Sequence, residues 1–253
     1  MNWDRYLEIV GTWEKVCVDP KGFNSLEFDT PVVPKDYLSF AEKDLELNNS
    51  HGHVNSLSNA KRAIDCQITN ILSVLGLPKS GNIHKKIERI KGIEVLAPRI
   101  LKKLNKIRNL LEHEFTKPTL DEAEDAVDIA TLFLAATEKV FINFMNSFWV
   151  AKNGTENSFN YSNEEIDIDD LTNRITFSDG MYFQFDHSSK SYSVWCYLND
   201  KEVFYADVEL GSALHCELVR YSILNYSNDL NYDEELMGSE FLARISKKRG
   251  ISP

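Results

Sequence analysis

One short stretch of the chain combines residue types that can do chemistry on an anionic substrate. It reads Arg108-Asn109-Leu110-Leu111-Glu112-His113. Imidazole titrates near neutral pH, and guanidinium forms strong paired hydrogen bonds with phosphate groups. An Arg and a His five positions apart are therefore a candidate constellation for acid–base chemistry, provided that the backbone brings them to one surface.

A helix over residues 95–115 would do so. At about 100° per residue, one face of about 140° holds the polar residues of this segment. They are Asn105, Arg108, Asn109, Glu112 and His113. Leu104, Ile107 and Leu111 fall on the opposite side. Arg108 and His113 lie roughly 7.5 Å apart along such a helix, within reach of the long Arg side chain. The alternative is an ordinary surface ion pair between Arg108 and Glu112.

A strongly basic segment surrounds this stretch. Residues 79–108 contain ten basic and two acidic side chains, a net charge of +8 in a chain whose total is −11. The basic residues are Lys79, Lys85, Lys86, Arg89, Lys91, Arg99, Lys102, Lys103, Lys106 and Arg108. Such an island can bind a polyanion locally although the whole chain is acidic. The alternative is a solvated, lysine-rich helix surface.

Apolar residues recur at helical spacing through the first 150 residues. They predict helices near 3–13, 34–47, 57–75, 83–90, 95–115 and from 120 to about 144. Gly76 and Pro78 end the third, and Thr119 with Glu122 forms a capping box before the last. We therefore expect residues 1–50 to form an N-terminal helical segment that packs on a helical bundle of residues 51–150.

Beyond this bundle the pattern changes to that of a sheet. Residues 151–170 are polar and predict a linker. Ser178-Asp179-Gly180 predicts a hairpin turn, and Asn199-Asp200 a second turn between strands near 192–198 and 203–208. A helix is expected over 212–225, so residues 171–253 form a small α+β domain. The predicted fold class is α+β: an antiparallel four-helix bundle followed by a small antiparallel β-meander with a helix.

Composition excludes several classes of protein. No apolar run reaches the roughly 20 residues that a membrane-spanning helix needs, and the N-terminus lacks the pattern of a secretion signal. The four cysteines are scattered and form no C-x-x-C pair, which argues against a disulfide scaffold or structural zinc. A cytoplasmic location is expected.

The stretch from Arg108 to His113 resembles the R-x(4–6)-H motif of the HEPN domain family, in which a polar residue follows the Arg. Asn109 matches that preference, and residues 59–65 resemble the long first helix of such domains. The resemblance covers about residues 50–150. It implies a HEPN-like bundle that cleaves RNA without a metal or other cofactor, through attack of the ribose 2′-oxygen on the adjacent phosphate.

The resemblance also implies roles and partners. His113 would shuttle the proton, Arg108 would hold the phosphate and stabilise its charge, and Asn109 would orient His113 or the phosphate. The lysines Lys85, Lys86, Lys102 and Lys106 would contact the RNA backbone. A homodimer with a composite site is implied, and a toxin, abortive-infection or phage-defence system with an antitoxin or defence partner is the expected setting.

Other groups of residues are weaker candidates for a functional site. His51, His53 and Asp65 lack a convincing metal-ligand spacing, and the acidic run 164–170 lacks the glycine and terminal Glu of a calcium loop. The aromatics of the predicted sheet are candidates for base stacking, although alternation along strands must bury some of them. They are Tyr182, Phe183, Phe185, Tyr192, Trp195 and Tyr197. The rival function is therefore a non-catalytic module for dimerisation or for binding a nucleotide or partner.

Overall fold

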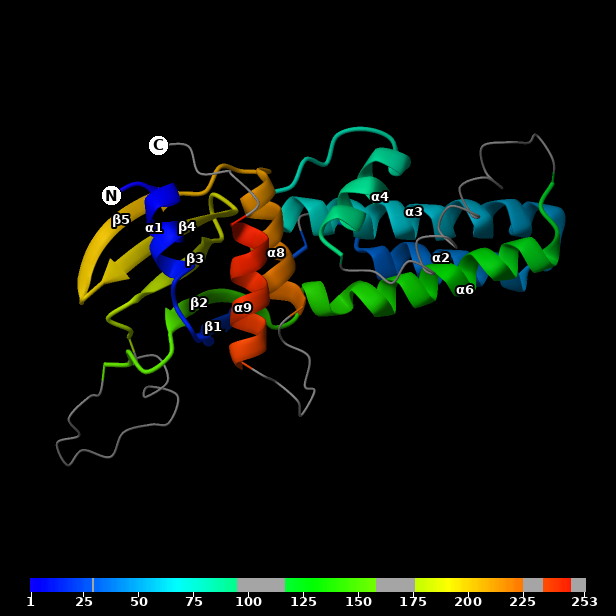
Figure 1. The fold of residues 1–253 in the computed structure, drawn as a ribbon. Coiled ribbons are helices and arrows are strands. Elements are labelled where there is room, and N and C mark those ends of the chain that lie inside the picture. The colour runs from blue at the N-terminus through cyan, green and yellow to red at the C-terminus, as the bar shows by residue number, and fades with distance from the viewer. Residues whose placement is uncertain (29, 95–116, 158–175, 225–233, 247–253) are drawn as a thin grey trace, which may run out of the picture. The chain divides into compact units, whose positions relative to one another are not determined.

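A computed structural model describes residues 1–28, 30–94, 117–157, 176–224 and 234–246. These residues form an α+β fold with seven α-helices and a five-stranded antiparallel sheet, as predicted at the level of class (Figure 1). The chain divides into two compact units, Leu26–Ile142 and a second that joins Met1–Ser25 to Asn143–Pro253. This division differs from the expected boundaries at residues 50, 150 and 170.

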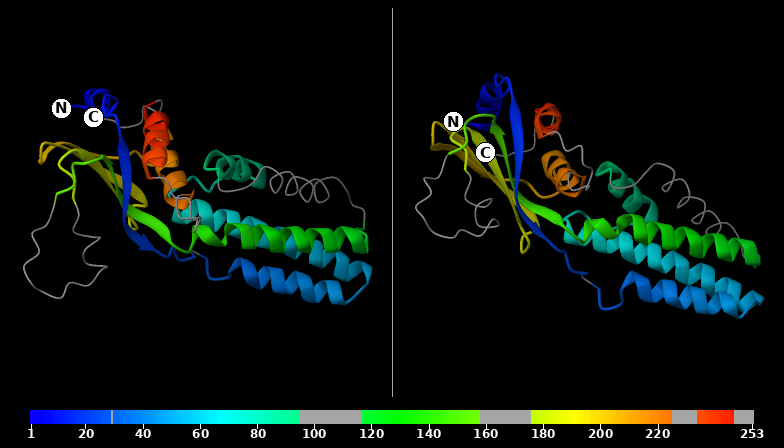
Figure 2. Two further views of the ribbon diagram at one scale, coloured as in Figure 1. Left: turned by 60° about the horizontal axis from the view of Figure 1, so that its bottom comes forward. Right: turned by 90° about the horizontal axis from the view of Figure 1, so that it is seen from below.

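The helical unit consists of α2 (Pro34–Glu46), α3 (Ser50–Val74), α4 (Ile83–Gly92) and α6 (Leu120–Thr137), followed by a short 3-10 turn, Glu138–Val140. The three longest of these helices lie side by side (Figure 2). Lys35 at the start of α2 pairs with Glu138 at the end of α6, 2.8 Å apart. Gln67 Nε2 donates to Thr137 Oγ1 at 2.8 Å near the ends of α3 and α6. Helix α2 therefore runs antiparallel to α6, and α3 parallel to it.

Local signals place the ends of these helices. The side chain of Asn49 accepts hydrogen bonds from the backbone of His51 and Gly52, so α3 begins earlier than the predicted residue 57. Gly52 is required there, because a Cβ would lie 2.4 Å from the carbonyl oxygen of Asp44. At the other end Gly76 adopts a φ of 68°, which confirms the predicted stop.

The capping box of α6 is also confirmed. Thr119 Oγ1 accepts from the backbone N–H of Glu122 at 3.3 Å, and the carboxylate of Glu122 accepts from the backbone N–H of Thr119 at 2.8 Å. Both bonds satisfy backbone donors that the first helical turn leaves unpaired.

The sheet unit contains β1 (Val16–Asn24), β2 (Phe144–Lys152), β3 (Gly180–Asp186), β4 (Ser191–Leu198) and β5 (Lys201–Asp207), in that spatial order. Helices α1 (Trp3–Val10), α8 (Ala213–Leu224) and α9 (Glu234–Ile245) lie on one side of it (Figure 2). Phe148 and Phe183 stack at 5.1 Å and both contact Phe241 of α9. This side of the sheet is the core of the unit.

Two expectations for the start of the sheet were wrong. Residues 144–152 form β2, although the helix after Thr119 was expected to reach residue 144. Residues 16–24, which include Pro20 and Gly22, form β1, although residues 1–50 were expected to form a helical segment. An edge strand tolerates proline because one of its sides needs no ladder hydrogen bond, and a register shift occurs at Gly22. A Cβ at Gly22 would lie 2.5 Å from Asn146 Oδ1.

The N-terminal helix and the predicted hairpin also differ from expectation. Helix α1 belongs to the sheet unit, where the hydroxyl of Tyr6 donates to the carbonyl of Gly180 at 2.7 Å. Of the described residues just before Ser178, Phe177 forms an isolated bridge with Glu156 and does not pair with β3; residues 158–175 lie outside the described residues. The other turn is confirmed: Asn199 and Asp200 both adopt positive φ, as a tight hairpin turn requires. Helix α8 agrees with its prediction, and α9 was not expected.

Candidate functional site

The predicted catalytic residues lie outside the described residues. This holds for Arg108, Asn109 and His113, and also for Lys102 and Lys106. Of the predicted phosphate contacts, Lys85 and Lys86 are described, and both belong to α4. The geometry of the candidate site is therefore given by α4 and by the part of α3 against which it packs.

Helix α4 is held in place by a cap and an apolar face. The side chain of Asn82 accepts from the backbone N–H of Lys85 at 3.1 Å and so begins the helix. Ile87 and Ile90 are buried one turn apart, and Ile93 follows them into the core. Lys85 and Lys91 lie on the exposed side of α4, whereas Lys86 is largely buried beside this apolar face.

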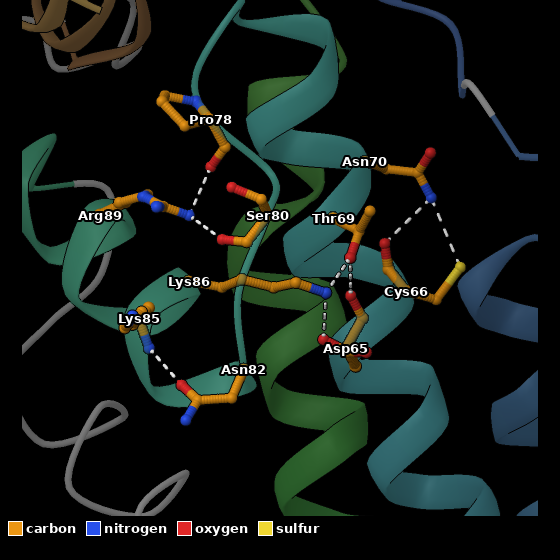
Figure 3. Close-up of polar contacts among 10 residues, drawn as sticks. All are labelled: Asp65, Cys66, Thr69, Asn70, Pro78, Ser80, Asn82, Lys85, Lys86 and Arg89. Atoms are coloured by element: carbon orange, nitrogen blue, oxygen red, sulfur yellow. Dashed lines mark hydrogen bonds and ion pairs between the residues drawn. The ribbon is translucent and has the colours of Figure 1, made fainter.

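Lys86 is tied to α3 by two contacts. Its ammonium lies 2.8 Å from Asp65 Oδ1 and donates to Thr69 Oγ1 at 2.9 Å (Figure 3). Only 11% of the Lys86 side chain is exposed, whereas 43% of the Asp65 side chain is. The neighbouring Lys85 is exposed, and its ammonium has no partner among the described residues. The predicted lysine pair is thus split: Lys85 faces solvent, and Lys86 would have to leave Asp65 to bind a phosphate.

The other described cations of the basic island also have internal partners. Arg89 donates to the carbonyl oxygens of Pro78 and Ser80 and so fixes the loop between α3 and α4 (Figure 3). Lys91 pairs with Glu88 at 3.2 Å, and Lys79 donates to the hydroxyl of Ser73 at 3.2 Å. These contacts stabilise the corner between the two helices. Lys85 is exposed there, and its ammonium has no partner among the described residues.

Cys66 follows Asp65 in α3 and has polar partners of its own. Its thiol donates to the carbonyl of Val32 at 3.4 Å. The Asn70 amide donates to the Cys66 carbonyl at 3.0 Å (Figure 3). Burial raises the pKa of the Cys66 thiol above its usual range. Because the thiolate is the nucleophilic form, this shift lowers the reactivity of Cys66.

The structure sorts the aromatics that were considered for base stacking. Phe183, Phe185 and Tyr192 are buried on the side of the sheet that the helices cover. Tyr182, Trp195 and Tyr197 are half-buried on the other side. Two further aromatic residues of that side were not among the predicted candidates. The strand pairing places Trp149 opposite Tyr182 and Tyr205 opposite Trp195. The alternation along β4 was the signal that separated the two groups.

The described part of the chain contains no group of three or more metal-ligating side chains that could hold a metal ion. Among the same residues, no helix is both long and apolar enough to cross a membrane.

Comparisons with protein-family models, with curated proteins and with solved structures found no match for this chain. The class of the protein is therefore defined by its fold alone: an α+β chain with a helical unit and a five-stranded antiparallel sheet unit.

Proposed function

We propose that the chain is a metal-independent endoribonuclease of the HEPN type, with Arg108, Asn109 and His113 as its catalytic residues. The observation that carries the proposal is the sequence of residues 104–113, which places an Arg and a His on one polar helical face opposite an apolar stripe. In this proposal His113 accepts the proton of the attacking ribose 2′-hydroxyl or protonates the leaving 5′-oxygen. Arg108 holds the phosphate and stabilises its added negative charge.

The described helices are compatible with this proposal. Helix α4 packs on α3 through Lys86 and Asp65, and α3 and α6 run parallel. The proposal adds a helix over residues 95–115, which lie outside the described residues, to complete a HEPN-like four-helix bundle.

Cleavage of single-stranded RNA in the presence of EDTA tests the proposal. Full-length wild type should cut a labelled RNA, and Arg108→Ala or His113→Ala should lose at least about a hundredfold in rate. Asn109→Ala should lose less if its role is orientation. Two matched controls should keep wild-type activity: Arg99→Ala, an arginine of the same segment, and His84→Ala, an exposed histidine of α4. Equal activity in wild type and all five variants would refute the assignment.

The proposed partners are RNA, a second copy of the chain, and an antitoxin or defence-system protein. Lys85, Lys102 and Lys106 would supply phosphate contacts, and each charge removed should reduce the salt dependence of RNA binding by about one unit of slope. Because the family places two motifs in one cleft, an active species that sediments as a monomer would contradict the composite site.

A non-catalytic binding module is the second candidate. Two observations favour it: most described cations of the basic island have internal partners, and the sheet unit carries aromatics on the side opposite to α1, α8 and α9. Binding of RNA, nucleotide or protein with no cleavage in any condition would identify this alternative.

A further inference from the structure

A row of four aromatic rings crosses the sheet on the side opposite its helices. Trp149, Tyr182, Trp195 and Tyr205 lie directly opposite one another on β2, β3, β4 and β5. Successive ring centroids are 5.3, 5.7 and 5.3 Å apart. Exposure rises along the row, from 6% for Trp149 to 46% for Tyr205. The row is thus anchored in a small apolar cluster at one end and open to solvent at the edge of the sheet.

Helices of the described residues do not cover this row. Trp3 of α1 contacts Phe204, and Phe241 of α9 contacts Phe183, and both partners point to the other side of the sheet. Tyr221 of α8 contacts Phe148 on that same side. Helices α1, α8 and α9 of the sheet unit therefore pack against one face of the sheet (Figure 2).

Two carboxylates flank the exposed end of the row on the same face. Register places Glu202 opposite Tyr197 and Asp207 opposite Ser193. Asp207 Oδ1 accepts hydrogen bonds from the hydroxyls of Tyr205 and Ser193, each at 2.7 Å. These bonds hold the pKa of Asp207 below its ordinary value, so the carboxylate is charged at neutral pH.

Two lysines near the row do not face these carboxylates. Lys201 precedes Glu202 in β5 and lies opposite Leu198, so alternation directs it to the other face. At the far end of the row, Lys21 is already paired with Asp19. The sheet unit as a whole has 12 basic and 22 acidic residues, a net charge of −10.

Strand β5 is also an edge of the sheet. In the described part of the chain its ladder partner is β4 alone. It contains no proline, and the outer N–H and C=O groups of such an edge can pair with an added extended segment. On the open face β5 presents Glu202, Tyr205 and Asp207, opposite Tyr197, Trp195 and Ser193 of β4. A register shift in β5 places one extra residue between Glu202 and Tyr205, so the acid, the ring and the second acid match the two-residue period of β4.

We propose that this face and the β5 edge bind an extended cationic peptide segment of a partner protein. Arg or Lys side chains at positions i and i+4 of the segment pair with Glu202 and Asp207. The cation at i+2 lies against the Tyr205 ring, where the negative face of the π-system attracts it. The site is separate from the ribonuclease motif and does not rest on that proposal.

Charge and ring packing favour a cationic peptide over RNA. The phosphates of an RNA strand would meet Glu202 and Asp207, a repulsive arrangement in a unit of net charge −10. The rings of the row also pack against one another at 5.3–5.7 Å, which occupies much of the ring surface that bases would need. Only the Tyr205 end offers a broad exposed ring.

Fluorescence anisotropy with the full chain tests the proposal. The probe is a labelled seven-residue peptide in which Thr alternates with Arg, and its matched control carries Glu in place of each Arg. Wild type should bind the Arg peptide and not the Glu peptide. Tyr205→Ala should weaken binding roughly threefold to fivefold, and Glu202→Gln with Asp207→Asn roughly tenfold. Control variants on exposed α2 positions, Phe40→Ala and Glu42→Gln, should leave binding unchanged.

Four outcomes would overturn the proposal. The first is no binding of the Arg peptide by a wild type whose circular dichroism is that of a folded protein, and the second is equal binding of the Glu peptide. The third is tighter binding of oligouridine that is lost in Tyr205→Ala, which would make the face a nucleic-acid surface. The fourth is a dimer that Tyr205→Ala dissociates while the Arg peptide stays unbound, which would make it a contact between copies.

Discussion

Replacing Lys86 by Met separates a structural role of this lysine from a role in RNA binding. Methionine keeps an unbranched aliphatic stem of similar length and removes the ammonium that contacts Asp65 at 2.8 Å and Thr69 at 2.9 Å. The matched substitution is Lys85→Met, one residue away on the same helix, where the charge is exposed and has no described partner. Lys86→Met should therefore destabilise the protein, whereas Lys85→Met should weaken RNA binding only.

The expected cost of Lys86→Met is about 1–2 kcal/mol of unfolding free energy. A charged hydrogen bond contributes roughly 1.5–3 kcal/mol, and exposed ion pairs contribute about 0.2–1 kcal/mol. The Lys86 side chain is only 11% exposed, but Asp65 is 43% exposed and is screened by water, which places the pair between these limits. Lys85→Met should change stability by less than about 0.5 kcal/mol.

Urea denaturation followed by far-UV circular dichroism measures both variants. All four tryptophans lie in the sheet unit, so their fluorescence reports that unit, while most of the helix signal comes from the other. A double-mutant cycle of Lys86→Met with Asp65→Asn isolates the pair and should give a coupling near 1 kcal/mol. Equal stability of the two Lys variants, or strictly additive effects in the cycle, would refute the reasoning.

Three further predictions follow from particular contacts. Thr137→Val removes the buried acceptor of the Gln67 amide and should cost about 1–3 kcal/mol in urea titrations, with a smaller cost once Gln67→Leu is added; equal costs would contradict this. Thr119→Ala removes the cap of α6 and should cost about 1 kcal/mol in thermal melts, and an unchanged midpoint would argue against the cap. The hydrogen bond to Asp207 raises the pKa of Tyr205, so its contribution to stability is present below the pKa of the unfolded chain and is lost as pH rises through the folded value. Asp207→Asn should lower that pKa in an ultraviolet absorbance titration, and an unshifted titration would contradict the hydrogen bond.

The elements that could be predicted from sequence are those with local signals. Helix α3 carries its own apolar period and stop at Gly76, and α6 its capping box. The segment of β2 does not predict a strand, because its apolar run is buried on both faces of the sheet. It therefore lacks the alternation that is typical of strands. Helix α9 was overlooked, although Phe241 and Ile245 lie four residues apart and both are buried.

The candidate sites depend on side-chain contacts that the composition of the chain does not determine. The count of basic residues between 79 and 94 could not say that Lys86 pairs with Asp65, 21 residues earlier in the chain, whereas Lys85 faces solvent. Likewise, only the pairing of β2 with β3 shows that Trp149 belongs to the aromatic row. Long-range register and pairing, set by packing, decide which side chains are available.

Analysis of RNA cleaved in EDTA tests the central claim most directly, because attack by the 2′-oxygen leaves a 2′,3′-cyclic phosphate and a 5′-hydroxyl. Wild type and His84→Ala should both give these ends and should spare a substrate with a 2′-deoxynucleotide at the cut position. His113→Ala and Arg108→Ala should give neither product above background. Cleavage that needs a divalent metal, leaves other ends, or persists in His113→Ala would contradict the assignment.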